Sequence, residues 1–171
     1  AFHGQMGMFV RALAYIESHG ADGLRQVAED AVLNANYILR SLDDVMSAPF
    51  GASGPCMHEA LFDDSYLKDS GITTLDVAKA MIDEGFHPMT MYFPLVVHGA
   101  MLIEPTETES KAELDRFIHA MRLLAEAAKA GDVERFKGAP FHAPLRRLDE
   151  TRAARSPVLR WTAPEGSNKA A

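Results

Sequence analysis

The apolar positions of residues 24–42 follow the spacing of one helix face. They recur three or four residues apart, as they do in an amphipathic helix, at Leu24, Val27, Ala28, Ala31, Val32, Ala35, Leu39 and Leu42. Asp22 stands just before this run and is a suitable N-cap. The pattern predicts a helix over residues 24–42.

Residues 2–16 differ from this helix because they are apolar almost all round. A helix of that character is normally buried rather than laid on a surface. A break at residues 18–23 separates the two segments. We therefore expect residues 2–16 to form a helix that something larger covers.

The middle of the chain alternates short apolar runs with turn residues. Runs at residues 45–50 and 57–62, on either side of a stretch rich in glycine and proline, predict two strands. Thr73 and Asp76 have the spacing of a capping box. The apolar face that follows predicts a helix of about 11 residues that ends near Gly85.

Residues 91–97 and 100–103 are rich in strand-forming side chains but are interrupted by proline and glycine, so short or irregular strands are expected. Residues 104–110 are acidic and hydroxyl-rich and open a third helix, whose apolar face continues to Ala128. The order of these elements predicts an α+β fold, a short sheet with helices on one face.

Charge divides the chain into two parts. The whole sequence has 171 residues, a length that is enough for about one domain. Its net charge is -7. Residues 1–131 carry 9 basic and 19 acidic residues, whereas residues 132–171 carry 8 and 5. An acidic body without a basic stripe argues against a nucleic-acid partner. The proline-rich end predicts an extended basic tail, laid along another surface to about Trp161 and disordered beyond.

Other site and membrane signals are weak. Cys56 is the only cysteine and lies in a turn rich in glycine and proline. Neither H-x-x-x-H nor H-E-x-x-H spacing occurs, so we expect no metal site. No apolar run approaches the roughly 18 residues of a spanning helix, and no signal-peptide pattern is present. A cytoplasmic protein without a membrane partner is expected.

Residues 104–109, Glu-Pro-Thr-Glu-Thr-Glu, place hydroxyls and carboxylates before the third helix. One interpretation is an ordinary cap by Thr106 or Thr108, with acids that suit the helix dipole. The other is contact with a substrate. No lysine or arginine lies between Lys79 and Lys111, so a substrate carboxylate here would not be held by an arginine fork.

Longer stretches resemble a known family. Residues 85–94, Gly-Phe-His-Pro-Met-Thr-Met-Tyr-Phe-Pro, together with residues 101–111 and 113–118, resemble the C-terminal part of the glycine dehydrogenases (decarboxylating), the P-proteins of the glycine cleavage system. Residues 24–37 look like the interdomain helix of that family. Residues 147–161 look like the tail of its subunit 2, from the two-subunit form.

The resemblance implies the small C-terminal domain of a fold-type I pyridoxal-phosphate enzyme, preceded by an interdomain helix. In that family glycine is decarboxylated on the cofactor, and its aminomethyl group passes to the lipoyl arm of the H-protein. The resemblance also implies subunit 1 as a partner, in a heterotetramer.

The family's cofactor lysine stands in a His-Lys motif before a glycine-rich run, and none of the six lysines of this sequence has that context. We therefore expect the fragment alone to bind no cofactor covalently, to contribute no catalytic residue and to be inactive. The alternative is a non-catalytic α+β module whose role is association.

The expected organisation has three parts. Residues 1–43 comprise the buried helix and the interdomain helix, residues 44–131 the small α+β domain, and residues 132–171 the tail. A small domain of this kind closes over the cofactor, so five of its residues are expected to contact substrate near the mouth of the active site: His87, Thr90, Glu104, Thr106 and Glu107.

Overall fold

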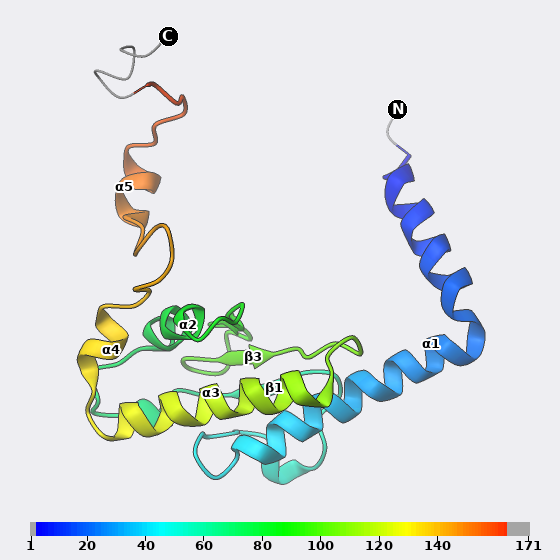
Figure 1. Cartoon of the computed structure of the whole chain (residues 1–171), viewed down its shortest axis with the longest axis horizontal. Helices are drawn as coiled ribbons and strands as arrows, with labels where there is room; N and C mark the ends of the chain where they lie inside the picture. Colours follow the sequence, from blue (N-terminus) through cyan, green and yellow to red (C-terminus); the bar gives the residue numbers. More distant parts are fainter. Residues whose placement is uncertain (1–2, 164–171) are drawn as a thin grey trace.

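A computed structural model describes residues 3–163. The elements, shown in Figure 1, are α1 (Met6–Leu42), the short 3-10 helix η1 (Gly51–Ser53), β1 (Ala60–Phe62), the 3-10 helix η2 (Ser65–Leu67), α2 (Thr74–Asp83), β2 (Thr90–Met91), β3 (Met101–Ile103), α3 (Lys111–Lys129), α4 (Val133–Lys137) and α5 (Glu150–Arg155). This is the α+β arrangement that the sequence predicted.

The sheet has three short antiparallel strands in the order β1-β3-β2. Leu102 of the central strand lies opposite Leu61 of β1 and Thr90 of β2. Because side chains alternate along a strand, one face of β1 and β3 is buried and the other is only half-buried. The buried face consists of Ala60, Phe62, Met101 and Ile103.

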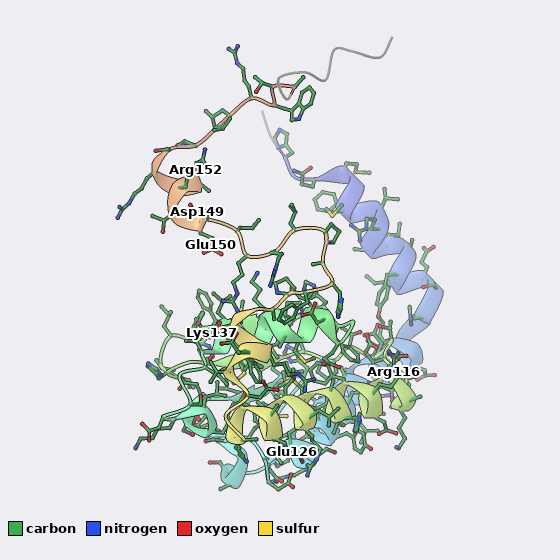
Figure 2. The ribbon with its side chains drawn as sticks, turned by 60° about the vertical axis from the view of Figure 1, so that its left-hand side comes forward. Arg116, Glu126, Lys137, Asp149, Glu150 and Arg152 are labelled. Atoms are coloured by element: carbon green, nitrogen blue, oxygen red, sulfur yellow. The ribbon has the colours of Figure 1, made fainter. Side chains whose placement is uncertain are left out.

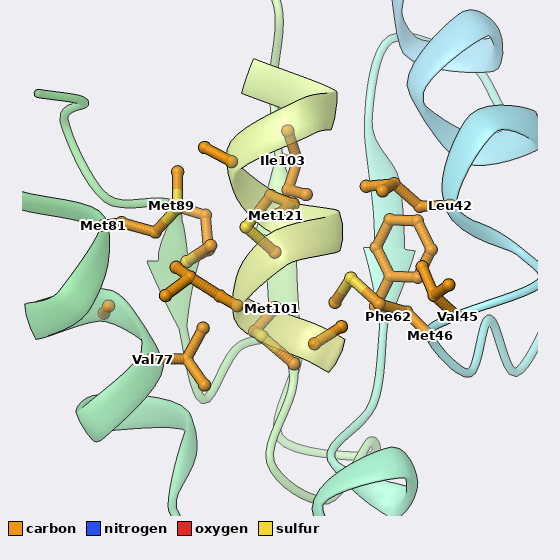
Figure 3. Packing of buried hydrophobic residues seen from close by; sticks show 14 of the residues in the cluster. Leu42, Val45, Met46, Phe62, Val77, Met81, Met89, Met101, Ile103 and Met121 are labelled. Carbon is orange, nitrogen blue, oxygen red and sulfur yellow. The ribbon is translucent and has the colours of Figure 1, made fainter. Parts of the chain in front are cut away.

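Helix α3 crosses the sheet, with α2 and the end of α1 on either side of it (Figure 3). Phe62 is fully buried close to Leu42 of α1. Met101 and Met121 fill the opposite half of the core, toward α2. Methionine suits such a junction because its flexible side chain fills irregular gaps.

Helix α1 bends at Gly20, whose φ of 64° and ψ of -176° lie outside the helical region. Glycine adopts such a conformation readily because it has no Cβ. The break predicted at residues 18–23 is therefore confirmed. Asp22 is not a cap: it lies inside α1, and its carboxylate accepts a hydrogen bond from Arg25 at 2.6 Å.

The two halves of α1 have different environments. The half beyond Gly20 is the predicted helix over residues 24–42, and its C-terminal turns pack on the body. The half before Gly20 is a helix from Met6 but extends away from the body (Figure 1). This chain leaves its apolar side chains exposed: Met6, Met8, Phe9, Val10, Leu13, Tyr15 and Ile16.

The predicted capping box of α2 is confirmed. The side chain of Thr73 accepts a hydrogen bond from the backbone N–H of Asp76, and the Asp76 carboxylate accepts one from the backbone N–H of Thr73. Helix α3 is also confirmed, but its N-cap is Ser110, whose Oγ accepts from the N–H of Glu113 at 3.2 Å. The predicted caps Thr106 and Thr108 are wrong.

Two of the predicted strands are also wrong in extent. Residues 45–50 form turns, because the N–H groups of Val45 and Met46 donate back to the carbonyl of Leu42; Ser47 alone forms a bridge, to Asp63. In residues 91–97 the strand ends at Met91, because Tyr92 has a φ of 60° and turns the backbone away. The strand predicted at residues 57–62 is shortened to β1.

The first part of the predicted tail packs on the body. Helix α4 buries Phe136 completely and lies beside α2 (Figure 2). Beyond it the chain leaves the body, and α5 has no buried residue. The disorder expected after about residue 161 falls mainly on residues 164–171, which lie outside the described residues.

Candidate functional site

A cavity of about 400 Å³ opens where β2, β3 and the start of α3 meet. Gly85, with a φ of 86°, ends α2 and turns the chain into the segment that forms one wall. The central strand forms the floor and α3 the opposite wall. The lining residues are Ile38, Phe86, His87, Pro88, Met89, Thr90, Leu102, Ile103, Glu104, Pro105, Glu109, Glu113, Leu114 and Phe117.

Three of the five predicted site residues therefore share this cavity: His87, Thr90 and Glu104. They come from the wall, β2 and the end of β3, which lie next to one another only because β2 pairs with β3. All three side chains are exposed to solvent.

The other two predicted residues, Thr106 and Glu107, do not line the cavity. They accept hydrogen bonds from side chains of α1 instead. The carbonyl of Thr106 accepts a hydrogen bond from Asn34 Nδ2 at 2.9 Å, and Glu107 Oε1 accepts one from the hydroxyl of Tyr15 at 2.8 Å. The bond from Tyr15 lowers the pKa of Glu107 below its usual value. Thr106 and Glu107 thus connect the loop beside the cavity to both halves of α1.

The cavity contains two carboxylates that the sequence analysis did not single out, Glu109 and Glu113. Glu109 stands just before the N-cap Ser110 and Glu113 lies in the first turn of α3, so both are placed by the start of that helix. Arg116 donates to both oxygens of Glu113, at 2.7 and 2.9 Å. Glu104 and Glu109 leave the cavity predominantly negative.

The residues that line this cavity do not fit pyridoxal phosphate. That cofactor needs a lysine for its covalent attachment and partners for a phosphate dianion. None of the lining residues is lysine or arginine, and three are glutamates that repel a phosphate. The nearby Lys111 is directed to Asp115, with Nζ 2.7 Å from Oδ2, and to the hydroxyl of Tyr37.

A second cavity of about 530 Å³ lies on the half-buried face of the sheet, over Leu61 and Leu102. Its walls include Phe50 and Phe93, and the polar side chain of Glu59. Cys56 also lines it, and burial raises the pKa of its thiol. This cavity has no lysine or arginine either, so it offers no attachment point for the cofactor.

The described residues contain neither a metal-binding cluster nor a membrane-spanning helix. Within residues 3–163, no group of three or more histidine, cysteine or acidic side chains is arranged to hold a metal ion. None of the helices in that range combines the length and the apolar character needed to cross a membrane.

Comparison with known proteins places the chain in a family. A family model described as the C-terminal domain of glycine dehydrogenase matches residues 27–145. That range is well over half of the 171 residues. The chain belongs to this family. The range starts within α1 and ends in the tail, and it contains every residue that lines the first cavity.

Similar full-length proteins carry the same family name. The chain is 83% identical over 161 residues to a probable glycine dehydrogenase (decarboxylating) subunit 2 of Caulobacter vibrioides, covering 94% of this chain and 30% of that protein. Proteins of the same name from Kosmotoga olearia and Shouchella clausii are 49% and 48% identical, with 94% of this chain and 33% and 32% of theirs covered. The chain thus spans about a third of the length of these relatives.

Proposed function

We propose that this chain works as the C-terminal part of subunit 2 of a glycine dehydrogenase (decarboxylating). The observation that carries the proposal is the family match over residues 27–145, supported by 83% identity to a protein of that name. The complete enzyme acts on glycine in the cytoplasm, with pyridoxal phosphate as cofactor, subunit 1 as partner in a heterotetramer and the lipoyl arm of the H-protein as acceptor of the aminomethyl group.

The residues that bind the cofactor belong, in this proposal, to the other two thirds of the subunit or to subunit 1. The absence of any lysine or arginine from the lining of either cavity supports this division. This chain instead contributes a wall of the substrate site, and alone it is inactive.

The charge of the first cavity supports a specific orientation of glycine. Glu104 and Glu109 attract an amino group and repel a carboxylate. His87 and Thr90 line the same cavity and add hydrogen-bonding groups. We assign these side chains to the amino end of the substrate, and Thr106 and Glu107 to the mouth of the site, where they hold α1.

The test of the enzyme function is exchange of labelled CO2 with the carboxyl group of glycine. The protein to use is a complete subunit, made by joining this chain to the preceding segment of the Caulobacter relative, together with subunit 1 and the H-protein. Exchange is expected. A complete subunit that binds subunit 1 but gives no exchange would instead identify the chain as a non-catalytic association module.

The test of the cavity is Glu104→Gln in that complete subunit. Loss of one hydrogen bond to a charged group should raise KM for glycine about tenfold. The matched control is Glu126→Gln, at an exposed position of α3 that is not part of the cavity lining. Equal KM values for the two variants would remove Glu104 from the substrate site.

A further inference from the structure

Residues 144–163, the C-terminal arm, extend from the body and contribute no side chain to its core. Figure 2 shows Asp149, Glu150 and Arg152 of α5 well clear of α2 and α3. Every residue of the arm is exposed. Five of its exposed side chains are large and apolar: Leu145, Leu148, Val158, Leu159 and Trp161.

The base of the arm is fixed to the body at Arg147. Its guanidinium pairs with Asp76, Nη1 to Oδ1 at 2.7 Å, and donates to the carbonyls of Ala139 at 2.8 Å and Phe136 at 2.7 Å. Asp76 is 2% exposed, so the arm is attached to a buried side chain of the body. A fixed base limits the directions that the arm can take, which lowers the entropic cost of binding.

The composition of the arm is that of a binding surface. It carries five arginines against two acids, a net charge of +3, and the only tryptophan of the chain. Tryptophan and arginine are the residues most enriched where protein interfaces concentrate their binding energy. Leu159 and Trp161 are 89% and 84% exposed, the arrangement expected of side chains that a partner covers.

A second exposed apolar surface lies on the same side of the body as the arm. It is the half of α1 before Gly20, and both views, which share one vertical axis, show it and the arm extending upward from opposite ends of the body (Figures 1 and 2). Because the two apolar segments extend in the same direction, one large partner that lies between them can contact both.

The relatives indicate what that partner is. This chain covers only 30% to 33% of their length, and the family model that it matches is a C-terminal domain. The remaining segment of the relatives therefore joins the chain on the α1 side. We propose that the C-terminal arm docks on this preceding segment of its own subunit, in an apolar groove bordered by acidic residues. This inference rests on the proposed function.

The test is the rate at which trypsin cleaves after Arg152, Arg155 and Arg160. In this chain alone the three bonds should be cut rapidly. In the complete subunit described above, docking should slow their cleavage at least tenfold. The double variant Leu159→Asp with Trp161→Ser should restore rapid cleavage in the complete subunit. Met57→Asp, at an apolar position exposed to 75% outside both projections, is the control and should not.

Each other result overturns the docking proposal. Equal cleavage of the arm in the two proteins means that the preceding segment does not cover it. Protection that appears in this chain alone and grows with its concentration identifies a second copy as the occupant, and protection only after subunit 1 is added identifies that subunit. Glycine–CO2 exchange is measured on the same samples, so an unprotected arm in an active enzyme refutes the docking and leaves the proposed function standing.

Discussion

The side chain of Asp76 connects three parts of the chain: the start of α2, α4 and the C-terminal arm. It closes the capping box of α2 with Thr73, and it is almost completely buried. Lys137 Nζ lies 2.6 Å from its Oδ2, and Arg147 Nη1 lies 2.7 Å from its Oδ1. Thr73 and Asp76 are recognisable in the sequence because capping is local. Lys137 is 61 residues away, so that contact could not be predicted.

We predict that Asp76→Asn destabilises the chain by about 2 kcal/mol, because it weakens the hydrogen bonds that Lys137 and Arg147 make to the buried carboxylate. The measurement is the free energy of unfolding in urea. Glu126→Gln, which removes an exposed carboxylate from α3, should change that free energy by less than about 0.5 kcal/mol. Similar losses in the two variants would contradict the assigned role.

The same variant serves to check the pH dependence. Burial raises the pKa of Asp76, but hydrogen bonds from Lys137, Thr73 and Arg147 outweigh it and lower the pKa to about 2, from a usual 3.8. A pKa lowered by folding adds stability that is complete above the unfolded pKa and disappears as pH falls through the folded one. The stability difference between the natural chain and Asp76→Asn should therefore shrink between pH 3.8 and pH 2.

At the scale of elements, helices were predicted well and strands poorly. The apolar spacing of α2 and α3 extends over ten residues or more, and each carries its own cap. Runs as short as residues 45–50 have no such redundancy, and a short apolar run does not distinguish a strand from a buried turn. Helix α4 was missed because its five residues are too few to show a period.

Helix α4 nonetheless fixes the start of the tail, and Phe136 is the residue that does so. We predict that Phe136→Ala, at a fully buried position, costs about 3–5 kcal/mol in the free energy of unfolding. Phe141→Ala removes the same ring from a position that is 50% exposed and should cost about 1 kcal/mol. Urea denaturation of both variants gives the comparison, and equal costs would contradict the packing of α4.

At the scale of the whole molecule, one packed body carries two projections whose apolar side chains stay outside its core. The core is built from the second half of α1, the sheet, α2, α3 and α4, and it lacks every residue of the C-terminal arm. The arm and the first half of α1 hold most of the largest exposed apolar side chains.

We predict that a chain ending at Leu148 has the same free energy of unfolding as one ending at Ala163, within about 0.5 kcal/mol. A chain ending at Gly131, which lacks Phe136 and the partners of Asp76, should lose several kcal/mol or fail to fold. Urea titrations of the three proteins check this. Marked destabilisation on shortening to Leu148 would mean that the arm packs on its own body.

The sequence by itself determined the longer helices, the capping box of α2, the class of fold and the family, because these depend on local spacing or on long stretches of matching residues. It also led to the selection of His87, Thr90 and Glu104 as candidate site residues. Only the tertiary structure decided that these three line one cavity with Glu109 and Glu113, while Thr106 and Glu107 hold α1. Strand pairing, cavity walls and buried ion pairs join residues far apart in the chain, and no local pattern specifies which distant residues meet.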